Sequence, residues 1–99
     1  MDFRVLITPQ AEADITAVCR YTAVELLNLP AAAGLADALY DAVESLAEMP
    51  FRHPVWRNEP WKSRGVRSLG VKNYRIFYLA EKTARRVLVL RVFYNRTNT

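Results

Sequence analysis

The chain has 99 residues, a length that fits one domain over residues 1–99, and it carries 14 Lys and Arg against 10 Asp and Glu. Hydrophobic residues form 52% of the sequence, which excludes an intrinsically disordered chain, and no apolar run approaches the length that spans a bilayer. Residues 1–30 lack the pattern of a secretory signal, and the single cysteine, Cys19, excludes an internal disulfide, so we expect a cytoplasmic protein with no membrane partner.

The charge is divided unevenly between the two halves of the chain. Residues 1–50 carry two basic and eight acidic side chains, hence a net charge of −6, whereas residues 51–99 carry twelve basic and two acidic ones, hence +10. Charge segregated in this way produces a local field that attracts polyanions. We therefore expect a nucleic acid or an acidic protein as partner, and a solvated basic face without a ligand is the alternative.

The N-terminal half predicts a strand followed by two helices. Residues 3–7 are short, apolar and β-branched, which is typical of a strand. Thr8 and Pro9 suit the N-cap and the first position of a helix, and apolar residues then recur at helical spacing as far as Leu26. The segment 28–30 interrupts this pattern. A second helix is expected up to Met49-Pro50, with a buried stripe of Leu35, Leu39, Val43 and Leu46.

The C-terminal half predicts a loop followed by three strands. Residues 50–63 hold three prolines and two tryptophans without periodicity, so we expect a loop that Trp56 and Trp61 pin to the core. The last strand is nearly continuous Val and Leu, which indicates a central place in the sheet. The expected strands are residues 64–69, 74–79 and 86–94.

The order β-α-α-β-β-β predicts an α+β domain in which a helical hairpin packs on one face of a small, mostly antiparallel, four-stranded sheet. The opposite face of the sheet is then left open. Strand alternation would place one set of side chains together on the last two strands, namely Arg75, Phe77, Val89, Arg91 and Phe93.

Three segments resemble the RelE/ParE superfamily of toxins from type II toxin–antitoxin systems, and together they cover essentially the whole chain. The first is residues 8–15 followed by Tyr21, the second is residues 65–69 with 71–78, and the third is residues 89–96. The resemblance implies a cytoplasmic bacterial toxin that a tightly bound cognate antitoxin neutralises. It leaves the target open, because RelE-like members cut mRNA inside the ribosome, whereas ParE-like members poison DNA gyrase without being nucleases.

If the chain is a nuclease, the resemblance implies a site that uses neither a metal nor a cofactor. Arg75 takes the position of the arginine that stabilises the phosphate in RelE-like nucleases, and Glu59, before Pro60, resembles the general base of the YoeB-like branch. Tyr94 lies near the position of the general acid, and Arg96 resembles a second, C-terminal arginine. The structural alternatives are a solvent-facing arginine, a solvated glutamate, a packed tyrosine and a tail residue. The side chains expected to hold the RNA backbone are Lys62, Arg64, Arg67, Lys72 and Arg91.

The sequence departs from the nuclease pattern in one place that bears on function. The lysine pair that RelE carries on the strand before the catalytic arginine corresponds here to Val66 and Ser68, so that form of general base is absent. Our first hypothesis is a ribosome-dependent mRNA endoribonuclease. The alternatives are a ParE-like inhibitor of DNA gyrase, which binds without catalysis, and a degenerate homologue that binds only its antitoxin.

Overall fold

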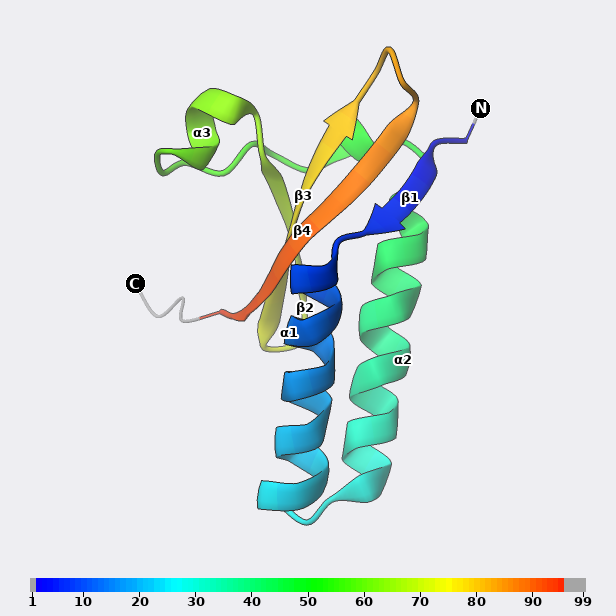
Figure 1. The fold of residues 1–99 in the computed structure, drawn as a ribbon, viewed down its shortest axis with the longest axis vertical. Helices are drawn as coiled ribbons and strands as arrows, with labels where there is room; N and C mark the ends of the chain where they lie inside the picture. The colour runs from blue at the N-terminus through cyan, green and yellow to red at the C-terminus, as the bar shows by residue number, and fades with distance from the viewer. Residues whose placement is uncertain (1, 96–99) are drawn as a thin grey trace.

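A computed structural model describes residues 2–95 of the chain, which fold into a four-stranded sheet and a helical hairpin (Figure 1). A π-helical turn, Tyr21–Glu25, extends the first helix, and a 3₁₀ turn, Pro50–Arg52, follows the second. In chain order the elements are β1 (Arg4–Ile7), α1 (Pro9–Arg20), α2 (Leu29–Ser45), α3 (Trp61–Arg64), β2 (Arg67–Val71), β3 (Tyr74–Glu81) and β4 (Arg86–Tyr94).

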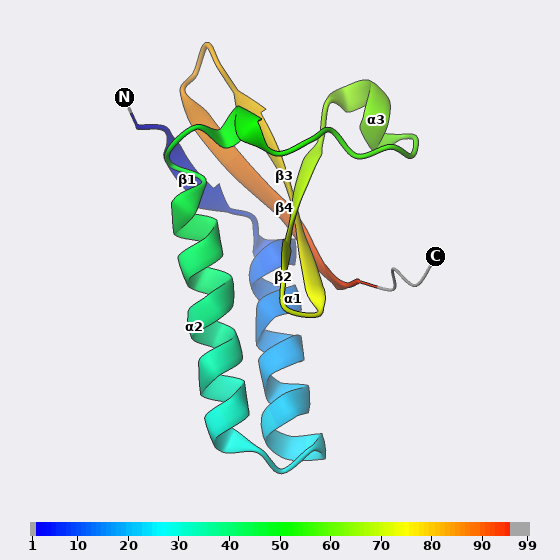
Figure 2. The ribbon, with the colours of Figure 1, turned by 180° about the vertical axis from the view of Figure 1, so that it is seen from behind.

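The sheet has the strand order β1-β4-β3-β2, so β4 is an interior strand as its composition predicts. β1 runs parallel to β4, and the other two pairs are antiparallel. Seen from the front and from behind, α1 and α2 lie side by side and extend beyond the sheet, which gives the molecule its long axis of 44 Å (Figures 1 and 2). This arrangement confirms the predicted α+β architecture with a helical hairpin on one face of the sheet.

Capping residues explain where the two long helices begin. The Thr8 hydroxyl accepts a hydrogen bond from the Ala11 N–H at 3.2 Å, and the Asn28 side chain accepts one from the Ala31 N–H at 3.0 Å. In each case a proline occupies one of the first two helical positions, where its missing N–H costs nothing. Between the helices Leu27 adopts a φ of 50°, which turns the chain back on itself.

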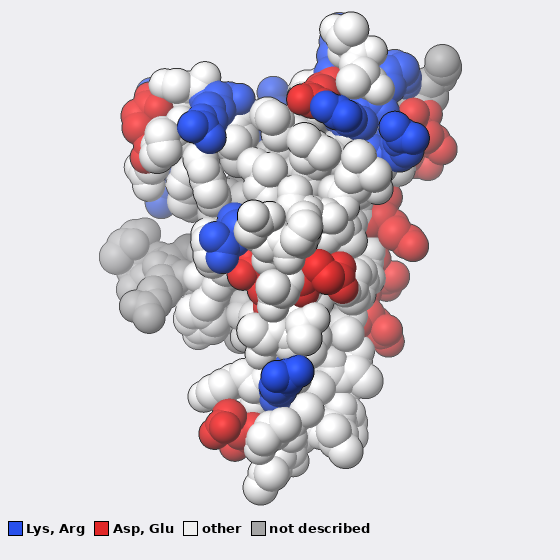
Figure 3. All heavy atoms as spheres, in the orientation of Figure 1, with Lys and Arg blue, Asp and Glu red and all other residues white. Residues whose placement is uncertain are grey.

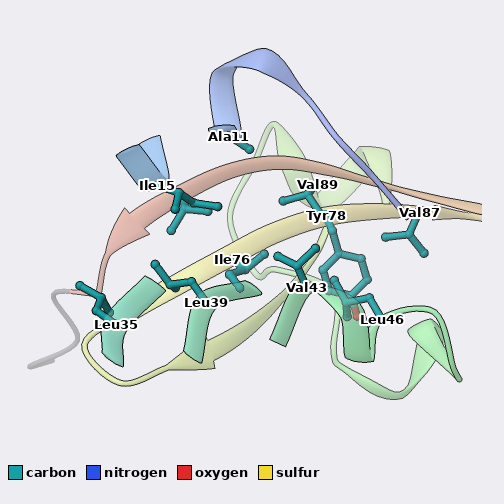
Figure 4. Packing of buried hydrophobic residues seen from close by; sticks show 11 residues of the cluster. Ala11, Ile15, Leu35, Leu39, Val43, Leu46, Ile76, Tyr78, Val87 and Val89 are labelled. Atoms are coloured by element: carbon teal, nitrogen blue, oxygen red, sulfur yellow. The ribbon is translucent and has the colours of Figure 1, made fainter. Parts of the chain in front are cut away.

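The core lies between the hairpin and one face of the sheet (Figure 4). Side chains of α2 fill its centre, and α1 and the three strands β1, β3 and β4 close it. Tyr78 is fully buried, and its hydroxyl donates to the Pro50 carbonyl oxygen at 2.6 Å, so its polar end is satisfied inside the core. The buried set is Ala11, Ile15, Leu35, Leu39, Val43, Leu46, Ile76, Tyr78, Val87, Val89 and Val92.

Two predicted segments differ from the structure. The strand expected at residues 64–69 begins only at Arg67, because Arg64 ends α3 and Gly65 turns the chain with a φ of 75°. The segment 50–63 is expected as a loop, yet it contains the 3₁₀ turn and the start of α3. Helices of three or four residues are too short to show a hydrophobic period, which is why the sequence pattern does not reveal them.

The predicted alternating set on β3 and β4 is also wrong at one position. Phe77 pairs with Arg91, but the next residue, Tyr78, pairs with Val89, so Leu90 is an extra residue in β4. The bulge reverses the alternation, and Val89 therefore lies fully buried under the helices, away from the open face.

None of the helices in residues 2–95 is both long enough and apolar enough to cross a membrane.

Candidate functional site

Aromatic rings cover the open face of the sheet. Phe77 lies at their centre, with its ring centroid 5.0 Å from that of Trp56, 4.6 Å from that of Trp61 and 5.9 Å from that of Phe93. The Trp61 and Phe93 rings are parallel within 9°, with centroids 6.4 Å apart. The two tryptophans thus fasten the segment 50–66 as predicted, but they fasten it to the face of the sheet opposite the helices and not to the core.

Arg75 lies beside this aromatic cluster in a cradle formed by β2 and Trp56. Its Nη1 donates to the Ser68 hydroxyl at 3.0 Å, and its guanidinium carbon lies 5.6 Å from the Trp56 ring centroid. A Cβ placed on Gly70, its cross-strand partner, would lie 3.4 Å from Nη2. The Nε atom is buried and has no hydrogen-bond partner among residues 2–95. Arg75 is therefore a half-buried, oriented arginine and not a solvent-facing one.

Glu59 caps the short helix α3. Its Oε1 accepts hydrogen bonds from the Ser63 N–H at 3.1 Å and from the Ser63 hydroxyl at 2.6 Å. Within residues 2–95 no hydrogen bond or ion pair joins Glu59 to Arg75. The contacts of this carboxylate are those of a structural cap, and they leave the predicted general base without a link to the predicted phosphate-binding arginine.

Tyr94 lies on the wrong face of the sheet for a site shared with Arg75. It pairs with Tyr74, whereas Arg75 pairs with Phe93, and neighbouring residues on a strand point to opposite faces. Tyr94 packs edge-to-face on Tyr74 with centroids 5.5 Å apart and is 59% exposed. The sheet therefore separates Tyr94 from Arg75, so the structure does not bring these two predicted residues together. Arg96, the fourth predicted member, lies outside the described residues.

The five side chains predicted to hold RNA divide into different environments. Lys62 and Arg64 are exposed on α3, next to the aromatic cluster. Arg67 instead donates from Nη1 to the carbonyl oxygens of Phe51 and His53, at 3.2 and 2.6 Å, and so holds the loop in place. Lys72 lies in the β2–β3 turn with a φ of 54°.

Arg91, the fifth predicted RNA contact, is engaged by an acid. Its guanidinium forms an ion pair with Asp14 of α1 at 2.8 Å. Burial alone would raise the pKa of the Asp14 carboxyl, but hydrogen bonds from Arg91 and from the Val92 amide, with the positive charge of Arg91, lower it below its usual value of 3.8. Two of the five predicted RNA contacts, Arg67 and Arg91, are therefore engaged within the fold. Arg86 is similarly paired with Glu81.

The surface charge follows the division between the halves of the chain. Figure 3 shows basic side chains gathered around the β3–β4 turn, and acidic side chains along the edge formed by α2. The acidic edge comes from residues spaced by three or four positions on that helix, namely Asp37, Asp41 and Glu44.

Within residues 2–95 no group of three His, Cys, Asp or Glu side chains is placed to hold a metal ion.

Sequence reasoning missed the residues that build the Arg75 cradle. Ser68 and Gly70 alternate on β2, so they share a face with each other and, through pairing with β3, with Arg75. The alternation of Ser68 and Gly70 could have indicated this shared face, but only if the bounds of β2 had been predicted correctly. Arg57 was also missed, and its guanidinium carbon lies 4.9 Å from the centroid of the Trp56 ring.

The helical hairpin carries an apolar hollow that is lined by residues of the hairpin itself. It has a volume of about 590 Å³ and lies between α1 and α2, with Ile15, Cys19, Ala32 and Tyr40 among its lining residues. Beyond it the tip of the hairpin exposes large apolar side chains, the most exposed of which is Leu27 at 86%. Exposed apolar surface of this kind is typical of a protein-binding region.

Comparison with known proteins agrees with the architecture. The model of a family described as the ParE toxin of the type II toxin–antitoxin system parDE matches residues 5–98. Among curated protein sequences, none matches the chain.

Two solved structures share the fold. A chain from the structure of the chromosomal ParDE TA system of P. aeruginosa superposes with a TM-score of 0.76 at 18% identity, covering 95% of this chain and 97% of that one. A chain from the toxin–antitoxin complex RelBE2 of Mycobacterium tuberculosis gives a TM-score of 0.67 at 23% identity, covering 96% of this chain and 100% of that one.

Proposed function

Because the chain belongs to the ParE toxin family of type II toxin–antitoxin systems, as its match over residues 5–98 shows, we propose that it arrests bacterial growth by binding DNA gyrase. In this proposal the toxin acts in the cytoplasm, and it acts by binding without cutting RNA. The observation that carries the proposal is that, among the described residues, Arg75 and Tyr94 lie on opposite faces of the sheet and Glu59 is engaged by Ser63.

Metal-independent RNA cleavage needs a base at the ribose hydroxyl, a cation at the phosphate and an acid at the leaving oxygen, all within hydrogen-bonding reach of one phosphodiester. Here the face of the sheet that carries Arg75 is opposite the face that carries Tyr94. The carboxylate of Glu59 is engaged by Ser63, and neither Val66 nor Ser68 offers the amine found in RelE. This arrangement favours a binding toxin over a nuclease.

A ribosome-dependent mRNA endoribonuclease is the second candidate, and one observation favours it. Arg75 is held against Ser68 and Trp56, and an oriented guanidinium suits a phosphate. An arginine alone provides electrostatic stabilisation but no proton transfer, so we rank this candidate below gyrase inhibition.

We also propose that a cognate antitoxin covers the helical hairpin. The two structural relatives are described as toxin–antitoxin assemblies, and this chain exposes an apolar hollow between α1 and α2 together with the apolar hairpin tip. An amphipathic helix that lays its apolar face in the hollow would remove this surface from water. The basic C-terminal half would attract acidic residues of the same partner.

Induced expression in a bacterial host tests the proposed target. Two readouts are followed in parallel after induction, the DNA damage response and the integrity of translated mRNA. The proposal predicts early induction of the DNA damage response while mRNA stays intact. Rapid mRNA cleavage and translation arrest without DNA damage would select the second candidate instead. The uninduced culture and co-expression with the product of the neighbouring gene serve as controls.

A further inference from the structure

We propose that protonation of His53 releases residues 53–56 from the start of β2, so that mild acidification moves the Trp56 ring away from the open face of the sheet. His53 is the only histidine of the chain. Histidine is also the only type of side chain whose ordinary pKa lies between about pH 5 and pH 8. Three features of the structure connect the charge of this ring to the position of residues 53–56.

The first feature is a ring nitrogen that is buried without a partner. Nε2 of His53 has no hydrogen-bond partner among residues 2–95. The ring packs edge-to-face on Tyr78, with 6.3 Å between the ring centroids and 87° between the ring planes. A protonated imidazole carries an N–H donor on each nitrogen and a positive charge, and burial of an unpaired donor or charge is unfavourable. The docked position therefore favours the neutral ring over the protonated one.

The second feature is the charge that surrounds the ring. Arg52 precedes His53 in the chain, and Arg67 of β2 donates from Nη1 to the His53 carbonyl oxygen at 2.6 Å. Tyr78 of β3 donates its hydroxyl to Pro50, and burial raises the pKa of Tyr78 to about 12, so this group stays neutral. The two ion pairs of residues 2–95 lie elsewhere, so no acid in this part of the chain compensates a charge on His53.

These surroundings determine how the docked state responds to pH. Burial, followed by the positive charge of Arg52, lowers the pKa of the His53 imidazole below its usual value of 6.5. Above about pH 6.5 the ring is neutral both when docked and when released, so pH has no effect. Below this pH the released ring takes up a proton that the docked ring does not, and the equilibrium constant for release rises by up to about tenfold per pH unit. The rise ends where the docked ring is protonated as well.

The third feature is the short pairing that follows His53. Two backbone hydrogen bonds and one β-bridge join residues 54–56 to the start of β2, between Val66 and Ser68. One of these bonds runs from the Trp56 N–H to the Val66 carbonyl oxygen, at 2.8 Å. His53 directly precedes this pairing and anchors its N-terminal end through the docked ring and the carbonyl oxygen. When the ring leaves its place, we expect the pairing to open.

The ring that moves with this strip covers Arg75. The Trp56 centroid lies 5.6 Å from the Arg75 guanidinium carbon and 5.0 Å from the Phe77 centroid. Trp61 has its own contacts with Phe77 and Phe93, which do not involve residues 53–56. Acidification is therefore expected to uncover Arg75 at one edge of the aromatic cluster while the sheet stays folded.

NMR spectroscopy of the isotope-labelled full chain tests both the proton uptake and the movement. The Hε1 resonance of the single histidine should titrate with a midpoint below 6.5. Amide hydrogen exchange of Trp56 and Ser68, whose N–H groups donate within the pairing, is measured between about pH 7.5 and pH 5. Each rate is divided by the rate in His53→Phe at the same pH, which cancels the intrinsic pH dependence of exchange. This variant keeps an aromatic ring beside Tyr78 and takes up no proton.

The ratio of the parent rate to the variant rate should rise by up to about tenfold per pH unit below about pH 6.5. His53→Gln is a second reference without a titratable group, for use if phenylalanine does not fit. A ratio that stays constant with pH, or an Hε1 midpoint at or above 6.5, would overturn the proposal. The amide of Ile76 in the buried part of β3 is the internal control. Equal protection of Ile76, Trp56 and Ser68 would mean that residues 53–56 open only when the whole chain unfolds, which would also overturn it.

Discussion

The Asp14 carboxylate on α1 accepts two hydrogen bonds from the Arg91 guanidinium on β4, at 2.8 and 3.0 Å. The same carboxylate accepts the Val92 backbone N–H at 2.9 Å. β1 pairs with β4 only as far as Ile7 and Val89, so Val92 has no partner strand on that side. Beyond the end of β1, the Asp14 carboxylate therefore replaces that strand as the hydrogen-bond acceptor for β4. It covers a part of the sheet edge that would otherwise expose an unpaired backbone donor.

Replacing Asp14 with Asn should destabilise the fold in a pH-dependent way. The folded-state pKa of Asp14 is lowered, so its contribution is complete above about pH 4 and is lost as the pH falls through the folded-state pKa. We expect Asp14→Asn to be less stable than the parent at neutral pH, with a difference that shrinks as the pH falls below about 4. Urea unfolding over a pH series measures this difference. Asp37→Asn, on the exposed side of α2, is the matched control, and equal stability of parent and Asp14→Asn at neutral pH would refute a stabilising role for the charged pair with Arg91.

Leu39 tests the position of the hydrophobic core. It is fully buried between the hairpin and the sheet, so Leu39→Ala should lower the free energy of unfolding by about 2–5 kcal/mol. Leu27→Ala makes the same chemical change at the exposed hairpin tip and should cost less than about 0.5 kcal/mol. Chemical denaturation of both variants provides the comparison. Similar losses at the two positions would mean that the buried face of α2 is wrongly assigned.

Glu59 distinguishes a helix cap from a general base. If the carboxylate caps α3, Glu59→Gln keeps an acceptor for Ser63, and growth arrest by the toxin should be unchanged within about threefold. If it were the base of a nuclease, the same change would slow cleavage by about 10²–10⁴-fold. Growth arrest is titrated by graded induction of the parent and the variant. A loss of a hundredfold or more in a folded variant, of the order expected for a general base, would contradict the capping role.

Trp61 tests how the segment 50–66 is held to the sheet. Trp61→Ala removes the ring contacts with Phe77 and Phe93, and it should cost about 1–3 kcal/mol and increase proteolytic cleavage within the segment. Tyr94→Ala removes an aromatic side chain on the other face and should leave the cleavage of this segment unchanged. Limited proteolysis followed by mass spectrometry locates the cuts. Equal resistance of the Trp61 variant and the parent would show that other contacts hold the segment.

The local sequence pattern predicts most of the fold, because the signals that define it are short-range. The cap at Thr8, the break at Asn28 and the stripe that includes Leu39 each act within a few residues, and the structure confirms them. Pairing with β3 determines the bulge at Leu90, so the sequence of β4 alone does not indicate it. For the same reason Val89 was assigned to the wrong face.

The candidate site was less predictable, because it depends on contacts between distant positions. Arg91 looks like a free cation in the sequence, but its partner Asp14 is 77 positions away. The sequence allows Tyr94 and Arg75 to share one site, but the strand register places them on opposite faces of the sheet. Arg75 itself was identified through the family resemblance, whereas its cradle of Ser68, Gly70 and Trp56 depends on the strand pairing and the loop path.

Supercoiling of a relaxed plasmid by purified DNA gyrase, over a titration of the purified toxin, tests the proposed inhibition of gyrase. We expect supercoiling to fall progressively as toxin is added. In a parallel reaction with translating ribosomes and the same toxin concentrations, we expect the mRNA to remain uncut. Full supercoiling at every toxin concentration, together with cleavage of the ribosome-bound mRNA, would contradict the proposed inhibition.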